Sequence, residues 1–291
     1  MDAGSGVELA GAALGGSRRG RRWNASLVVG GVVVGLVIVT ALLSFVWTPH
    51  DPTLVNAAAR LREPSGEYWF GTDKFGRDVF SQIMVGSRTA LFVGIVAVGV
   101  AALVGVPLGI VAGMGPRWLG EGLMRFNDLL LAFPALLLAI MFAAVYGGST
   151  LVAMIAIGIA SIPNFARLVR SGTLQVMKTE YVLAARAAGR HPFAIGLRHV
   201  LPNVSGLAIV QMSVGFAIAV LAEAALSFLG FGTPPPTPTW GRMLQSSQEL
   251  LWQAPRLAVF PGVAIALAVL GFNMLGDGLR DYLDPKLEDR R

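Results

Sequence analysis

The chain has 291 residues, of which 54% are hydrophobic and 14% charged, whereas an ordinary soluble domain is about a quarter charged. It contains no cysteine, which excludes a disulfide framework and a thiolate metal site, and its three histidines are not spaced as metal ligands. The net charge of +6 is more typical of Arg- and Lys-rich cytoplasmic loops than of a nucleic-acid-binding surface. The composition predicts an integral membrane protein with little mass outside the bilayer.

Six apolar segments approach the roughly 20 residues that a helix needs to cross the hydrocarbon core. The fourth reaches that length only if its helix continues past Pro163. The first is too long for the apolar part of a cleaved signal peptide, so we expect a retained anchor. The six predicted spans are residues 27–47, 89–113, 126–146, 151–162, 204–222 and 257–275.

Basic residues predict the orientation of these spans. With a cytoplasmic N-terminus and six spans, most of the 23 Arg and Lys residues fall on the cytoplasmic side, as the positive-inside rule requires. Without the fourth span, the C-terminal basic cluster would fall outside. We therefore expect cytoplasmic tails at 1–26 and 280–291, an extracytoplasmic loop at 48–87, and a five-helix core at 88–279 with a second outer loop at 230–255.

The second predicted span has an apolar stripe just before it and a glycine pattern within it. Val79, Phe80, Ile83 and Met84 form an apolar stripe, which predicts an interfacial helix leading into that span. Glycines at 105, 109 and 113 form two overlapping GxxxG repeats, where helix backbones can approach closely. We expect them to pack within this subunit, with a contact to a second membrane subunit as the alternative.

The segment 180–203 is a basic interruption between two apolar spans. Residues 180–188 favour a helix, Gly189 can end it in the left-handed conformation, and Pro192 suits the first turn of the next helix. That second helix is predicted to end at Pro202, and its apolar stripe consists of Phe193, Leu197, Val200 and Leu201. Two interpretations follow: an interfacial helix lying on lipid headgroups, or a docking element for a soluble partner.

A family resemblance bears on this choice. Ala184-Ala185, Gly189, Ile195 and Leu201-Pro202 resemble the "EAA" loop of prokaryotic ABC importer permeases, although Leu183 stands where that motif has Glu, and the nearest acid is Glu180. The resemblance implies that the segment is a coupling helix seated in a cleft of an ATPase subunit. The coupling residues it implies are Glu180, Ala184, Ala185, Arg186, Gly189, Arg190, Phe193, Ile195, Leu197 and Pro202.

Four further stretches narrow the family: "FGTDKFGRDVFSQIMVGSRTAL" (70–91), "RFNDLLLAFPALLLAI" (125–140), "AEAALSFLGFGTPPPTPTWG" (222–241) and "GDGLRDYLDPKL" (276–287). They resemble the dipeptide/oligopeptide/nickel permease group, and in particular the second of its two paired permeases. The resemblance implies an all-α type I ABC importer permease fold with six transmembrane helices. It also implies a homologous permease partner, two ATPase subunits that hold ATP and Mg, and an extracytoplasmic substrate-binding protein. The implied cargo is di- or oligopeptides, with nickel chelates or glutathione as the alternative.

Candidate residues on the outer side each have two interpretations. Asp73, Arg77 and Asp78, together with Trp240, are candidate contacts for the binding protein, and the three charged residues are equally well read as solvated loop charges. Glu223 lies near the outer end of the fifth span, where a carboxylate is expected to be paired or wetted. We favour a structural hydrogen bond or ion pair for Glu223 and keep a role at the gate or on the substrate as the alternative.

No catalytic constellation is visible in the sequence. There is no G-x-x-x-x-G-K-[ST] loop to cradle ATP, no H-E-x-x-H motif and no arranged Ser/His/Asp triad. We therefore expect a non-catalytic translocation subunit that binds no cofactor or metal itself. An ion-coupled secondary transporter is the competing class, but it needs ionisable or broken-helix sites near the bilayer midplane, and no charged residue falls at the centre of a predicted span. A membrane enzyme would need a polar cluster at one interface, and the sequence shows none.

Overall fold

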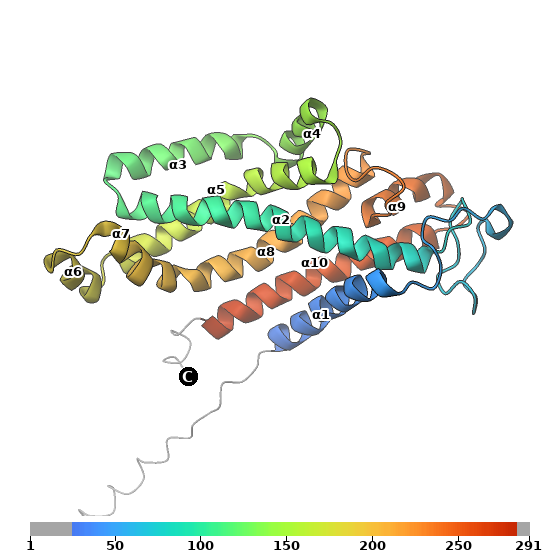
Figure 1. The fold of residues 1–291 in the computed structure, drawn as a ribbon, viewed down its shortest axis with the longest axis horizontal. Helices are drawn as coiled ribbons and strands as arrows, with labels where there is room; N and C mark the ends of the chain where they lie inside the picture. The colour runs from blue at the N-terminus through green and yellow to red at the C-terminus, as the bar shows by residue number, and fades with distance from the viewer. Residues whose placement is uncertain (1–24, 284–291) are drawn as a thin grey trace, which may run out of the picture.

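A computed structural model describes residues 25–283, and Figure 1 shows its fold. Within that range the chain is helical and has no strand, only one isolated bridge between Thr72 and Asp78. Most of both predicted cytoplasmic tails lies outside the described residues. The helices are α1 Ala25–Val46, α2 Val79–Met114, α3 Arg117–Ala132, α4 Ala135–Tyr146, α5 Thr150–Val176, α6 Glu180–Ala187, α7 Pro192–Ile195, α8 Leu201–Phe228, α9 Trp240–Ser247 and α10 Arg256–Leu283, with a π-turn at Gly196–Val200 and 3-10 turns at Ala57–Ala59 and Gln248–Leu250.

The long helices lie along one axis of an elongated bundle, with α6 and α7 at one end and the 48–78 segment and α9 toward the other (Figure 1). Five helices in the described range are long and apolar enough to cross a membrane, and six if the bent pair α3–α4 counts as one span. In Figure 1 the first residues of α1 and the last residues of α10 both point toward the α6–α7 end. This arrangement agrees with an even number of crossings.

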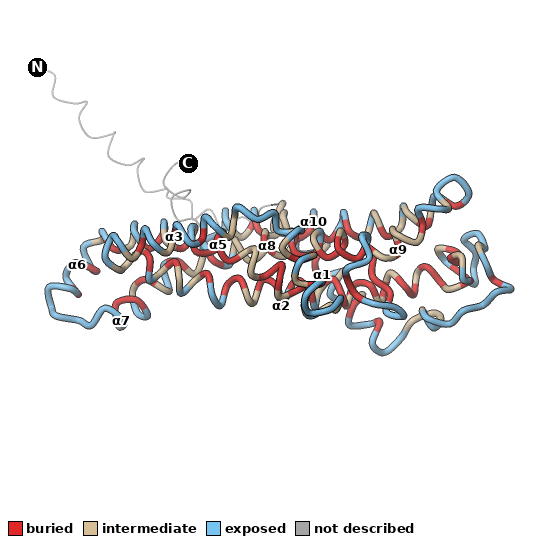
Figure 2. Tube along the Cα trace, turned by 90° about the horizontal axis from the view of Figure 1, so that it is seen from above, coloured by how far each residue is buried: buried red, intermediate tan, exposed pale blue. Residues whose placement is uncertain are grey.

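Glycines bring α2 and α5 into direct backbone contact. A Cβ at Gly105 would lie 2.6 Å from the Phe165 Cβ, and one at Gly109 would lie 2.7 Å from the Ala166 carbonyl oxygen. A Cβ at Gly113 would lie 2.6 Å from the Thr173 Cβ. The predicted packing of the GxxxG repeats within this subunit is confirmed. Figure 2 shows that burial is concentrated between the long helices and that exposed chain predominates at the α6 end.

The second span differs from its prediction. Instead of a separate interfacial helix followed by a span from residue 89, one helix of 36 residues begins at Val79. It is about 54 Å long at 1.5 Å per residue, which exceeds the roughly 30 Å hydrocarbon core. Asp78 caps its first turn by accepting from the Ser81 backbone N–H at 3.0 Å, and no proline interrupts the next turns. α2 is therefore longer than the bilayer core, and the predicted interfacial stripe is part of the same helix as the span.

The third span was predicted as one helix, but it is broken. α3 and α4 are bent by 79° at Phe133 and Pro134. A proline disfavours the helical conformation in the residue before it, and Phe133 is extended, with φ −88° and ψ 124°. Asp128 lies inside α3 and forms an ion pair with Arg167 of α5. Its role is a link between two helices.

The fourth and fifth spans are both longer than their apolar cores. α5 continues through Pro163 to Val176, as its spanning length required. The fifth span does not begin after Pro202, since α7, the π-turn and α8 form one helix over Pro192–Phe228. The Leu201 N–H bonds to the Gly196 carbonyl, one residue further back than in an α-helix, and this wider turn accommodates Pro202. The prediction that Pro202 ends the preceding helix is wrong.

Candidate functional site

Gly189 ends α6 in a complete C-terminal cap. Its φ of +74° lies in the left-handed region that side chains with a Cβ rarely adopt. The Gly189 N–H bonds to the Arg186 carbonyl at 2.9 Å, and the Arg190 N–H bonds to the Ala185 carbonyl at 3.1 Å. These two bonds are the Schellman pattern, which reverses the chain sharply at the end of a helix. The predicted turn at Gly189 is confirmed.

The next helix begins directly after this turn. His191 caps α7 because its Nδ1 accepts from the Phe193 backbone N–H at 3.3 Å. Pro192 occupies the first turn, where its missing N–H leaves no hydrogen bond unmade. The chain therefore forms a helix–turn–helix with few conformational alternatives, and α7 continues into α8.

One face of this helix–turn–helix is anchored to the long helices. Val182, Ala185, Ile195 and Val200 are buried in a cluster that also holds Val169 and Met177 of the α5 end and Val204 and Ala208 of α8. Ile195 is 1% exposed, so the prediction that it contacts a partner is corrected. Ile195 instead holds α7 against this subunit, because it follows Phe193 by two positions and so turns away from it on the helix. Through this buried cluster, α6 and α7 pack against the helix bundle.

Outside this buried cluster, the helix–turn–helix presents several apolar side chains to solvent. Phe193 is 70% exposed, and Leu197, Leu183 and Tyr181 are also exposed. Sequence reasoning did not select Tyr181 or Leu183 as contacts, although both lie one helical turn from residues it did select. Exposed large apolar groups gathered on a short protruding element mark an interaction surface. We call Tyr181, Leu183, Phe193 and Leu197 the apolar knob.

Charged and small residues surround the apolar knob. Glu180, in the first turn of α6, is exposed, as are Ala184, Arg186, Arg190 and Pro202. Among the described residues, no ion pair involves Glu180, Arg186 or Arg190. An apolar centre with an unpaired charged rim is the usual layout of a protein-binding surface. The geometry suits insertion into a groove of a partner.

The candidate contacts at the other end of the molecule are mostly buried. Asp73 forms an ion pair with Arg77 at 2.7 Å and also accepts from the Phe75 backbone N–H, so it closes the turn before α2. Asp78 is buried as the cap of α2, and Trp240 is 4% exposed and donates from Nε1 to the Ile83 carbonyl at 3.0 Å. The interpretation of Asp73 and Asp78 as solvated charges is wrong, and neither they nor Trp240 offers an open contact surface.

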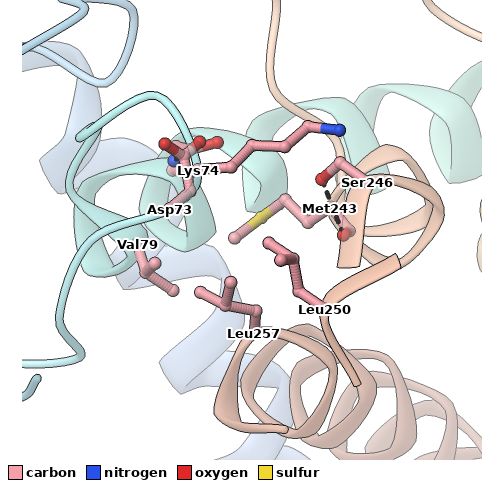
Figure 3. A pocket seen from close by; sticks show the side chains of 8 residues that line it. Asp73, Lys74, Val79, Met243, Ser246, Leu250 and Leu257 are labelled. Carbon is pink, nitrogen blue, oxygen red and sulfur yellow. Dashed lines mark hydrogen bonds between the residues drawn. The ribbon is translucent and has the colours of Figure 1, made fainter. Parts of the chain in front are cut away.

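Figure 3 shows the neighbourhood of Asp73, where the turn before α2 meets α9 and the start of α10. Val79, Met243 and Leu257 line a small pocket beneath the carboxylate, and Lys74 extends over Ser246. Lys74 also pairs with Glu249 at 3.2 Å. These contacts tie the 48–78 segment to α9 and α10, so this end of the molecule is a packed cap over the bundle.

Glu223 is buried between α8 and the segment leading into α9. It is 4% exposed, and it accepts a hydrogen bond from the Ser227 hydroxyl at 2.6 Å. The Thr239 side chain is a second hydrogen-bonding partner. Among the described residues no cation pairs with it, so hydrogen bonds alone satisfy this carboxyl group. The prediction of a structural hydrogen bond fits this geometry.

Comparisons with known proteins agree with the helical bundle. The family model described as "Binding-protein-dependent transport system inner membrane component" matches residues 105–289. A dipeptide transport system permease protein, DppC of Alkalihalophilus pseudofirmus, is 45% identical over 88% of this chain and 86% of its own length. Glutathione transport system permease proteins, GsiD of Pectobacterium atrosepticum and of Salmonella typhimurium, are each 42% identical, over 90% and 93% of this chain and 87% and 89% of their own lengths.

Proposed function

The chain belongs to the family of inner membrane components of binding-protein-dependent transport systems, and on that premise we propose that it is the permease subunit of an ATP-driven importer of short peptides. The apolar knob carries the proposal, since it is an anchored, exposed surface at one end of a membrane bundle. Its proposed partners are a homologous permease, two ATPase subunits that hold ATP and Mg, and an extracytoplasmic binding protein. ATP hydrolysis belongs to the ATPase subunits.

The proposed orientation places the α6–α7 end and both chain termini in the cytoplasm. The positive-inside bias of the sequence supports it. In that orientation the apolar knob faces the ATPases, and the 48–78 segment and the α8–α10 connection face the binding protein. Of the outer candidates, Arg77 is part-exposed, but its ion pair with Asp73 favours a structural role.

Coupling is proposed to act through the rigid anchoring of the knob. In this proposal Phe193 sits in a groove of an ATPase subunit, and closure of the ATPases moves that groove. The buried contacts of Ile195 and Val200 then carry the motion into α8, because α7 and α8 are one helix. A rigid helix transmits a displacement that a flexible loop would absorb. The ATPases shift the bundle between two states only insofar as they bind the knob differently in each.

Removing the knob's exposed side chains tests the docking. Phe193→Ala combined with Leu197→Ala should weaken retention of the ATPase subunits in detergent pull-downs by about tenfold or more, as expected for the buried centre of an interface. Trp252→Ala is the matched control, because Trp252 is a fully exposed aromatic residue at the other end of the molecule. ATPase retention equal to wild type in the double variant, with uptake intact, would contradict the proposal and leave an interfacial helix.

Uptake measurements test the proposed cargo. Cells that lack their own peptide importers and express this chain with its companion subunits should accumulate labelled dialanine. Excess unlabelled dipeptide should compete for uptake more strongly than glutathione or a nickel chelate. Glutathione is included as a competitor because relatives of this chain are named as glutathione transport permeases. Stronger competition by glutathione or by the chelate would replace the peptide assignment and leave the permease role unchanged.

A further inference from the structure

A cavity of about 330 Å³ lies at the end of the molecule opposite the apolar knob. Its lining comes from three segments: the chain after α1, the first turns of α2 and the α8–α9 connection. The lining residues are Thr48, Pro52, Thr53, Val85, Arg88, Pro236, Thr237 and Pro238. Arg88 is the one charged residue among them.

Arg88 is held in position by α1. Its Nε donates to the Ser44 hydroxyl at 2.6 Å, a second guanidinium nitrogen donates to the Ser44 carbonyl, and the guanidinium lies over the Phe45 ring, 4.1 Å from its centroid. These contacts orient the group without neutralising it, since among the described residues no carboxylate pairs with Arg88. The nearby Asp51 accepts from the Thr53 N–H at 2.8 Å and from its hydroxyl at 2.6 Å. Among the described residues, the cavity lining therefore contains one oriented cation and no carboxylate.

An apolar stripe runs from Arg88 along the bundle. Phe92 and Ile95 follow Arg88 at i+4 and i+7, so they lie on the same face of α2. Phe92 is 53% and Ile95 63% exposed. On α1, Leu42, Phe45 and Val46 are also exposed beside this position. A charged group in the third turn of a long helix, continued by exposed apolar side chains, matches the two halves of a membrane lipid.

We propose that this cavity binds the phosphate of an anionic phospholipid, whose acyl chains lie along the exposed faces of α1 and α2. Arg is suited to phosphate because its planar guanidinium forms charge-assisted hydrogen bonds with the oxygens. Thr48, Thr53 and Thr237 also line the cavity, and threonine hydroxyls can hydrogen-bond a glycerol headgroup. In the orientation proposed above, the lipid belongs to the outer leaflet. A peptide carboxylate would use Arg88 but would not need the apolar stripe.

Native mass spectrometry of the full chain, purified with its companion subunits, tests the proposal. The probes are phosphatidylglycerol, phosphatidylcholine, inorganic phosphate and dialanine. Thr237→Glu places a carboxylate in the cavity while Arg88 itself is not mutated, and Thr237→Gln is the uncharged control of similar size. Phosphatidylglycerol retention should fall about tenfold or more in Thr237→Glu and in Arg88→Gln, the loss expected for a charge-assisted hydrogen bond, and should stay near wild type in Thr237→Gln.

Several results would overturn the assignment. Equal phosphatidylglycerol retention in wild type, Arg88→Gln and Thr237→Glu would show that the lipid does not bind here. Equal retention of phosphatidylcholine would remove the preference for an anionic lipid. Displacement of the lipid by dialanine or by inorganic phosphate at matched concentration would assign the cavity to a free carboxylate or a free phosphate. Thr237→Glu changes neither Arg88 nor Ser44, so a folding defect of Arg88→Gln does not affect the result for Thr237→Glu.

Discussion

At the scale of single residues, Glu223 illustrates the cost of removing a buried hydrogen-bonding partner. Its carboxyl group is buried with the Ser227 hydroxyl as partner at 2.6 Å. A buried hydroxyl left without a partner costs about 1–3 kcal/mol. The identity of the residue at 223 should therefore matter first through stability.

We expect Glu223→Gln to keep near wild-type stability, because an amide oxygen still accepts from Ser227. Glu223→Ala should lower the free energy of unfolding by about 1–3 kcal/mol, seen as a lower thermal midpoint in detergent. Ser227→Ala is the matched control and should resemble Glu223→Ala. If Glu223→Gln instead assembles normally and loses peptide uptake, the carboxylate acts in transport.

Gly189 gives a second prediction, because the backbone conformation at this position restricts substitution and neighbouring atoms do not. No atom lies within 4 Å of a Cβ added there, so only its φ of +74° restricts substitution. Asn adopts this region readily, whereas a β-branched residue does not. Gly189→Asn should keep ATP hydrolysis coupled to uptake, and Gly189→Val should misdirect α7 and uncouple them. Equal coupling in both variants would mean that the turn does not position the knob.

At the scale of elements, the close approach of α2 and α5 is the contact most sensitive to size. Gly109→Ala would place its Cβ 2.7 Å from both the Ala166 carbonyl oxygen and the Val169 Cβ, and neither neighbour has a flexible end that can move aside. Overpacking of this kind costs about 1–3 kcal/mol. The expected result is a lower thermal midpoint in detergent.

Gly99→Ala is the internal control for this prediction. Gly99 lies on the same helix, and no atom lies within 4 Å of a Cβ added there. Alanine favours a helix over glycine by about 1 kcal/mol, so this variant should be as stable as wild type or more stable. The same thermal midpoint for both variants would mean that α2 and α5 are not in contact at Gly109.

At the scale of the whole molecule, topology can be measured directly. The chain contains no cysteine, so each single-cysteine variant carries one thiol at a known position. Single cysteines at Ser65 and Gly148 should react with a membrane-impermeant maleimide in intact cells. Cysteines at Arg117 and Ala188 should react only after permeabilisation. All four positions are exposed. Labelling of Gly148 and Arg117 from the same side would make α3–α4 a re-entrant loop and not a bent crossing.

Local chemistry made much of the helical organisation predictable. Hydropathy located five of the long helices, and spacing identified the GxxxG face of α2. The turn at Gly189 followed from backbone sterics, which act within a few residues. Sequence reasoning failed where the outcome depended on neighbours distant in the chain. Ile195 and Trp240 look like surface anchors in sequence, yet each is buried by helices far from it along the chain.

The sequence by itself determined the helical class, the membrane character and the place of the chain reversal, because hydropathy, helix periodicity and the conformational range of glycine and proline are local properties. Only the tertiary structure decided which faces stay open. The bend at Pro134, the continuity of α7 with α8 and the burial of Asp73 and Asp78 depend on which helices meet. The exposed half of the α6–α7 surface and the Arg88 cation, which has no ion-pair partner among residues 25–283, likewise emerge only when segments distant in sequence pack together, because burial and ion pairing are properties of neighbours in space.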